Sequence, residues 1–172
     1  WLIRRFLEAG VMIDGQREET DEGVPQGSVL SPLLANVYLR YVLDLWFERD
    51  VKPRLTGEAC MTRYADDFIV GFECEDDARR FQEVLQKRLA RYSLELAEEK
   101  TKLVRFGRFA ERDCAREGNG SKPGTFDFLG FTHYCGHSRS GGFKLKRKTS
   151  TNKLRTKYQS VKDWLRHRLT TP

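Results

Sequence analysis

The sequence lacks any long apolar run and has few cysteines. None of its 172 residues belongs to a run of about 18 apolar residues, the length that a membrane-spanning helix needs. No signal peptide opens it, and its 4 cysteines include no C-x-x-C pair, so we expect reduced thiols in a cytoplasmic protein. The first residue is Trp1 and not Met, which predicts that the chain is a piece of a longer protein.

Acidic residues are scarce near the C-terminus. Residues 137–172 hold 11 basic residues and the single acid Asp163, a net charge of +10, whereas residues 1–136 carry −4 and the whole chain +6. Such a basic segment predicts a polyanionic partner, above all nucleic acid. A solvated surface helix and an anionic membrane are the weaker alternatives, since the few apolar residues here do not make the broad face of an interfacial helix.

Hydrophobic periodicity predicts an α+β fold with a mainly antiparallel sheet packed on helices. In the clearest helix, Ser31 is a good N-cap and Pro32 suits the first helical position. We expect helices at 1–9, 31–46, 76–92 and 151–168, strands at 11–13, 16–20, 60–64, 68–72, 94–97, 101–106, 126–134 and 143–147, and loops at 23–28 and 107–124. The inner face of the helix at 76–92 is expected to consist of Phe81, Val84, Leu85 and Leu89.

Two adjacent carboxylates, Asp66 and Asp67, lie between apolar, β-prone segments and are expected at the tip of a hairpin. Adjacent like charges repel, and a tight turn could use Asn-Gly instead. A divalent cation removes the repulsion, and Mg²⁺ prefers carboxylate oxygen together with substrate phosphate. Two such ions can clamp the attacking and leaving oxygens of a phosphoryl transfer. From these two residues alone, an ordinary acidic turn is the alternative.

Tyr64-Ala65-Asp66-Asp67 resembles the catalytic box of reverse transcriptases. Three further segments are similar to motifs of that family: 23–36 to the upstream palm motif, 99–101 (Glu-Lys-Thr) to the next one, and 128–131 (Phe-Leu-Gly-Phe) to the primer-grip hairpin. The four motifs occur in the family's order. The match is closest to the reverse transcriptases that bacterial group II introns encode, which are also splicing maturases.

The resemblance implies a partial reverse transcriptase palm at 1–148, truncated at its N-terminus, and a basic helical start of the thumb at 149–172. It implies an RNA-directed DNA polymerase that uses two Mg²⁺ ions, an RNA template, a DNA primer and deoxynucleoside triphosphates. Asp66 and Asp67 would hold metal, and Lys100 would protonate or steady the leaving pyrophosphate. Nucleotide and template would be bound by Gly23, Pro25, Gln26, Gly27, Ser28, Tyr64 and Ala65.

The resemblance also assigns residues to the nucleic acid backbone. The primer grip would be formed by Leu129, Gly130 and Phe131, because glycine permits a close approach of the primer. Cations would hold the phosphates of the template–primer duplex without reading its sequence. These cations are Lys144, Lys146, Arg147, Lys148, Lys153, Arg155 and Lys157.

The family places a further catalytic aspartate and a fingers subdomain before the matched region. No acid within residues 1–22 lies on a convincing buried strand, so we expect this chain alone to be inactive and its parent to be the polymerase, associated with intron RNA. Three alternatives stay open: a non-catalytic maturase that assists splicing, a reverse transcriptase of a phage-defence or diversity-generating system, and a basic adaptor without chemistry. The adaptor predicts salt-dependent binding that is independent of magnesium.

Overall fold

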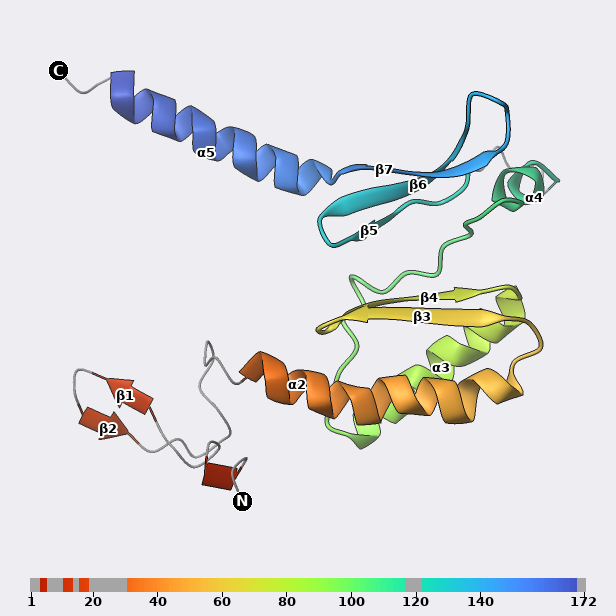
Figure 1. Cartoon of the computed structure of the whole chain (residues 1–172), viewed down its shortest axis with the longest axis horizontal. Helices are drawn as coiled ribbons and strands as arrows, with labels where there is room; N and C mark the ends of the chain where they lie inside the picture. Colours follow the sequence, from red (N-terminus) through yellow and green to blue (C-terminus); the bar gives the residue numbers. More distant parts are fainter. Residues whose placement is uncertain (1–3, 6–10, 14–15, 19–30, 117–121, 170–172) are drawn as a thin grey trace. The chain divides into compact units, whose positions relative to one another are not determined.

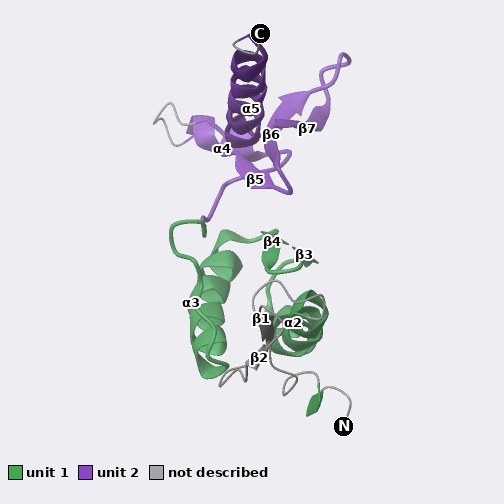
Figure 2. Cartoon of the chain, turned by 90° about the vertical axis from the view of Figure 1, so that its left-hand side faces the viewer, with its two compact units in different colours: residues 1–101 green, residues 102–172 purple. Residues whose placement is uncertain are grey.

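The computed structural model describes residues 4–5, 11–13, 16–18, 31–116 and 122–169. The chain divides into two compact units, residues 1–101 and 102–172, which Figure 2 colours separately. Both units combine helices with antiparallel strands (Figure 1), and this confirms the predicted α+β class. The division between a palm and a thumb near residue 148 concerns function and stays a prediction.

The N-terminal hairpin is present as expected. Strand β1 (Val11–Ile13) pairs antiparallel with β2 (Gln16–Glu18), and Ile13 lies opposite Gln16. Arg4 and Arg5 are helical, in agreement with the helix expected at 1–9. The remainder of that helix and the loop expected at 23–28 lie outside the described residues.

One continuous helical segment follows from residue 31 to residue 54. It consists of α2 (Ser31–Leu39), the π-helical stretches η1 (Arg40–Asp44) and η2 (Phe47–Val51), and the 3₁₀ turn η3 (Lys52–Arg54). The helix begins at the residue that the Ser-Pro signal indicated and continues beyond the expected end. Four large apolar residues in its first part are exposed, namely Leu33, Val37, Tyr38 and Tyr41, whereas Val42, Leu43, Trp46 and Phe47 further along are buried.

The core of the first unit lies between this helix, helix α3 (Glu75–Arg91) and one face of the hairpin formed by β3 (Ala59–Tyr64) and β4 (Asp67–Phe72). The buried residues are Val42, Leu43, Trp46, Phe47, Ala59, Phe81, Leu85 and Leu89. Phe81 joins the three elements, since its ring centroid lies 5.7 Å from that of Phe47 and 5.2 Å from that of Phe72. The predicted hairpin and its helical cover are therefore confirmed.

Two expectations about α3 and the segment that follows it are wrong. Val84 is 48% exposed, because it lies about 100° around the helix from Leu85 and reaches only the edge of the buried stripe. The strands expected at 94–97 and 101–106 are absent from this described stretch. Leu94 donates its N–H to the Leu89 carbonyl at the end of α3 and packs on the core without a partner strand.

The second unit contains a three-stranded antiparallel sheet in the order β5 (Phe126–Phe128), β6 (Phe131–His137) and β7 (Phe143–Thr149). The single strand expected at 126–134 is thus divided by a turn at Leu129 and Gly130. The expected loop at 107–124 contains the short helix α4 (Ala110–Arg116), which buries Ala110 and Cys114 and so gains apolar contacts that its polar composition did not indicate.

Helix α5 (Thr151–Leu169) confirms the basic helix expected at 151–168. Ser150 precedes it, is 5% exposed, and accepts a hydrogen bond at its Oγ from the Lys153 N–H at 3.5 Å, as an N-cap residue does. All side chains of α5 are exposed. Leu154, Tyr158, Val161 and Leu165 follow one another at helical spacing, so the helix has an apolar stripe that the sequence analysis underrated.

The helix α3 core can be tested with two neighbouring residues. Leu85 is 3% exposed. Leu85→Ala should lower the free energy of unfolding by about 2–5 kcal/mol, because the change leaves a cavity. Val84→Ala should cost about 0.5 kcal/mol or less, as exposed substitutions do. Urea denaturation followed by circular dichroism measures both, and equal losses would contradict the packing described for α3.

Asp77 connects the first turn of α3 to the segment before β3. Asp77 is 2% exposed, and its carboxylate accepts hydrogen bonds from the N–H groups of Thr56 at 2.8 Å and Gly57 at 3.0 Å. The bond from Gly57, helped by that from Thr56 and opposed by burial, lowers the pKa of Asp77 from its usual 3.8. The carboxylate is therefore ionised in the folded protein at neutral pH and acts as a structural acceptor.

Asp77→Asn should therefore lower the urea midpoint at pH 7. An acid whose pKa is lower in the folded protein than in the unfolded chain stabilises the fold. This contribution is complete at pH values above the unfolded-state pKa and is lost as the pH falls through the folded-state pKa. The difference between the variant and the parent should narrow below about pH 4. The control is Asp76→Asn, at the exposed neighbouring residue. If the difference in urea midpoint between Asp77→Asn and the parent did not change with pH, the charge of Asp77 would have no role in stability.

Candidate active site

The two adjacent carboxylates lie at the tip of the β3–β4 hairpin. Tyr64 is paired with Asp67, which leaves Ala65 and Asp66 as a two-residue turn. Ala65 has a φ of +53°, and Asp66 is not among the residues of positive φ. Positive φ at the first central residue alone is the pattern of a type II′ turn, which suits the twist of a hairpin. The expected hairpin with two acids at its tip is confirmed.

Alternation along the strands decides which way each neighbour faces. Arg63 and its partner Phe68 lie on the side that packs on the helices, whereas Tyr64 and its partner Asp67 lie on the opposite side. Tyr64 is 65% exposed. It is therefore not a core aromatic residue, and its role in binding nucleotide and template stays a prediction.

The two acids offer a donor set that fits a hard divalent cation. Both residues are exposed, and no ion pair with another described residue neutralises either carboxylate. Carboxylate oxygens are the ligands that Mg²⁺ prefers. Within the described parts of the chain no cluster of three or more acidic, histidine or cysteine side chains could hold a metal, so these residues supply two carboxylates and no third.

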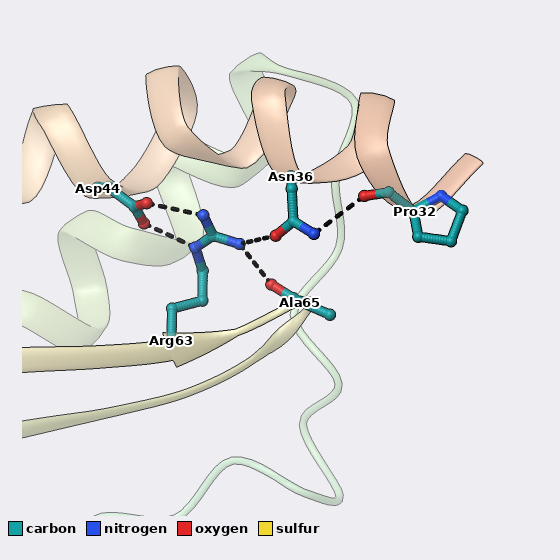
Figure 3. A network of polar contacts seen from close by, with 5 residues as sticks. All are labelled: Pro32, Asn36, Asp44, Arg63 and Ala65. Carbon is teal, nitrogen blue, oxygen red and sulfur yellow. Dashed lines mark hydrogen bonds and ion pairs between the residues drawn. The ribbon is translucent and has the colours of Figure 1, made fainter. Parts of the chain in front are cut away.

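A polar network connects the turn to the long helix (Figure 3). Arg63 donates from Nε and Nη2 to the two carboxylate oxygens of Asp44, each at 2.7 Å, and from Nη1 to the Ala65 carbonyl, also at 2.7 Å. The hydrogen bond with Asp44 raises the pKa of Arg63, so the guanidinium stays charged. Sequence reasoning missed both residues, although a cation at an inward position of an alternating strand signals that an acid must face it.

Lys100 lies in an exposed turn after α3. The Thr101 N–H donates to the Ala97 carbonyl at 3.0 Å, and the Thr101 hydroxyl donates to the same oxygen at 2.8 Å. Among the described residues, no ion pair or hydrogen bond joins the Lys100 side chain to either carboxylate of the hairpin, so its role stays a prediction. The residues expected to bind nucleotide at 23–28 lie outside the described part of the chain.

The turn expected to form the primer grip is a tight hairpin turn between β5 and β6. Leu129 and Gly130 both have positive φ, +50° and +81°, as a type I′ turn requires. The Gly130 carbonyl accepts a hydrogen bond from the Ser150 N–H at 3.0 Å, and the side chain of Lys153 lies where a Cβ at Gly130 would be. The turn, Ser150 and Lys153 thus form one packed group.

The seven expected backbone-binding cations do not share one surface. Strand alternation places Lys144, Lys146 and Lys148 on one face of the sheet, with Tyr134 beneath them. Arg147 lies on the opposite face, where its guanidinium stands 5.6 Å from the Phe131 ring centroid. In α5, Lys153 and Lys157 share a side as predicted, and Arg155 lies about 200° around the helix from each.

A family model matches the part of the chain that contains the β3–β4 hairpin. The family model described as reverse transcriptase (RNA-dependent DNA polymerase) matches residues 1–133. The chain therefore belongs to the reverse transcriptase family. Within the described residues, no helix is both long and apolar enough to cross a membrane.

Two relatives are described as proteins of introns. The group II intron-encoded protein LtrA of Lactococcus lactis subsp. cremoris is 32% identical over 120 residues, which cover 64% of this chain and 20% of LtrA. An uncharacterised 91 kDa protein in the cob intron of Schizosaccharomyces pombe is 45% identical over 47 residues, or 27% of this chain and 6% of that protein. The matched region thus spans about a fifth or less of these relatives.

Proposed function

We propose that the chain contributes the catalytic hairpin of an RNA-directed DNA polymerase encoded by a group II intron. The observation that carries this proposal is the Ala65–Asp66 turn in a chain of the reverse transcriptase family. It presents two exposed carboxylates at a hairpin tip, and no described residue forms an ion pair with either of them. The similarity to LtrA supports the group II intron type. The substrates are an RNA template, a DNA primer and deoxynucleoside triphosphates, and intron RNA is the further partner.

In this proposal Asp66 and Asp67 hold two Mg²⁺ ions, with Asp66 at the turn as the more direct ligand. When bound, such ions stabilise the charge that develops on the oxygens of a phosphoryl transfer. The carboxylates come from one hairpin, so the fold of the hairpin sets their separation. Lys100 would protonate the leaving pyrophosphate or steady its charge, and Leu129 to Phe131 would support the primer. Nucleotide and template would be bound by Gly23, Pro25, Gln26, Gly27, Ser28, Tyr64 and Ala65.

The chain is also proposed to hold the nucleic acid backbone through its second unit and to act in the cytoplasm. The four cysteines are unpaired, which suits a reducing compartment. Lys144, Lys146 and Lys148 present three positive charges on one face of an antiparallel sheet. Gly136 leaves room for the aliphatic part of Lys146 to lie across the sheet, since a Cβ there would come within 2.8 Å of Lys146 Cδ.

Asp66→Asn tests the catalytic assignment. In the protein expressed from its complete gene, primer extension on an RNA template should fall by more than about 100-fold, because loss of even an indirect partner of a metal site typically costs 10–100-fold. Affinity for the template–primer should change little, since a single carboxylate does not hold the duplex. Asp76→Asn, an exposed acid on α3, is the matched control.

Extension by Asp66→Asn at the parent rate would rule out the catalytic assignment. Absence of extension in the parent protein, combined with assistance to intron splicing, would instead favour the non-catalytic maturase.

The lysine face can be tested by its contribution to salt dependence. The double variant Lys144→Gln/Lys148→Gln should reduce the slope of log affinity against log salt by about 2, because each lost phosphate contact removes about one released counterion. Lys87→Gln/Arg91→Gln removes the same charge from the exposed side of α3 and should leave the slope unchanged. Filter binding of a labelled RNA–DNA duplex between 50 and 200 mM salt, the range over which such affinities change steeply, measures both. Equal slopes for the two double variants would contradict a specific role for this face.

A further inference from the structure

Arg63 is an almost buried cation whose donors are divided between the long helix and the catalytic turn. Its side chain is 10% exposed and that of Asp44 is 27% exposed. Besides its two bonds to Asp44, the guanidinium donates from Nη1 to the Asn36 Oδ1 at 2.9 Å and to the Ala65 carbonyl at 2.7 Å. The Asn36 side chain is itself fixed, because its Nδ2 donates to the Pro32 carbonyl at 3.0 Å (Figure 3).

The irregular winding of the helix brings these acceptors together. Residues 36 and 44 would lie about 80° apart around a regular α-helix with 3.6 residues per turn. In the stretch that ends at Asp44, the Leu45 N–H donates to the Arg40 carbonyl, an i→i+5 bond that makes the turn wider than an α turn. Figure 3 shows Asn36 and Asp44 both pointing toward the guanidinium. The π-helical stretch η1 is therefore part of the network.

The bond to the Ala65 carbonyl acts on the peptide that leads to Asp66. A peptide unit is planar, so fixing its oxygen also fixes the N–H and the Cα of the next residue. Ala65 has a φ of +53°, a region that residues with a Cβ seldom occupy and that glycine or asparagine would occupy more readily. An Ala-Asp turn of this geometry thus benefits from an external restraint, and the Arg63 Nη1 supplies one.

We propose that Arg63, held by Asp44 and Asn36, is a positioning residue that orients the Asp66 carboxylate for metal binding by fixing the Ala65–Asp66 peptide. This inference rests on the proposed function, which assigns the metal to Asp66 and Asp67. Lysine cannot replace arginine in this role, because one ammonium group cannot span both oxygens of Asp44 and also reach the two carbonyl-type oxygens of Asn36 and Ala65.

The test is Arg63→Lys in the protein expressed from its complete gene. Mn²⁺ is the probe, and the loss of its free electron paramagnetic resonance signal measures binding without turnover. The dissociation constant for Mn²⁺ should rise about 10–100-fold, as it does when residues that orient metal ligands are changed. The Mg²⁺ concentration for half-maximal extension should rise in parallel, while the KM for template–primer stays unchanged.

Arg79→Lys is the matched control. Arg79 forms a 2.6 Å ion pair with Glu75 on the exposed side of α3, and the same substitution there should leave Mn²⁺ binding unchanged. A purely structural role of Arg63 predicts a lower melting temperature together with unaltered Mn²⁺ affinity of the folded protein. Unaltered affinity in Arg63→Lys, with binding lost in Asp66→Asn, would overturn the positioning role and leave the metal assignment intact.

Asn36→Ala keeps the test decisive if Arg63→Lys does not fold. It removes one of the four bonds of the guanidinium and leaves the ion pair with Asp44. We expect its Mn²⁺ affinity to fall several-fold with the circular dichroism spectrum unchanged, and an unchanged affinity would overturn the proposal. Undiminished Mn²⁺ binding by Asp66→Asn would disprove the proposed metal site itself, and this inference with it.

Discussion

The first unit depends on the burial of one face of a two-stranded hairpin. Such a hairpin is marginal by itself in water, so β3 and β4 need the cover of the long helix and α3. Phe81 lies where the three elements meet, in contact with Trp46, Phe47 and Phe72. Because side chains alternate along each strand, burial of this face also decides that Tyr64 and Asp67 lie on the other one. A shift of register by one residue would reverse both faces. The packing of the core and the exposure of the acids therefore depend on the same strand register.

The same alternation turns Arg63 toward the helices, where an unpaired cation would be costly. Asp44 neutralises this cation and accepts hydrogen bonds from it with both carboxylate oxygens, in the bidentate geometry that arginine favours. The third nitrogen of the guanidinium remains available, and it reaches the turn at Ala65. A residue that the strand pattern forces inward thus becomes the link between the helix and the tip of the hairpin.

Local signals predicted much of this fold. Apolar, β-prone segments on both sides of Ala65 to Asp67 indicated the hairpin, and Ser31-Pro32 indicated where the long helix begins. The strands expected at 94–97 and 101–106 failed because a strand exists only with a partner, and the sequence of one segment does not show whether a partner is present. The ion pair of Asp44 with Arg63 was missed for a related reason, since it joins residues 19 positions apart and depends on a π-helical stretch that no composition rule indicates. The candidate site residues were predicted from the resemblance to a family, whereas Asp66 and Asp67 alone had left an ordinary acidic turn as the alternative.

In the basic segment, residues 137–172, composition indicates the kind of partner, whereas the fold decides which cations lie on the same face. A net charge of +10 over residues 137–172 is a property of composition, and it indicates the kind of partner. The sheet then separates the cations of β7 by alternation, so that Lys144, Lys146 and Lys148 lie together while Arg147 faces the other way. Helix α5 separates its own cations around its circumference, on either side of a stripe that includes Leu154 and Tyr158. A nucleic acid backbone can therefore meet only part of this charge on any one face. The remaining cations still raise the general attraction of the segment for a polyanion, which acts at a distance and decreases with added salt.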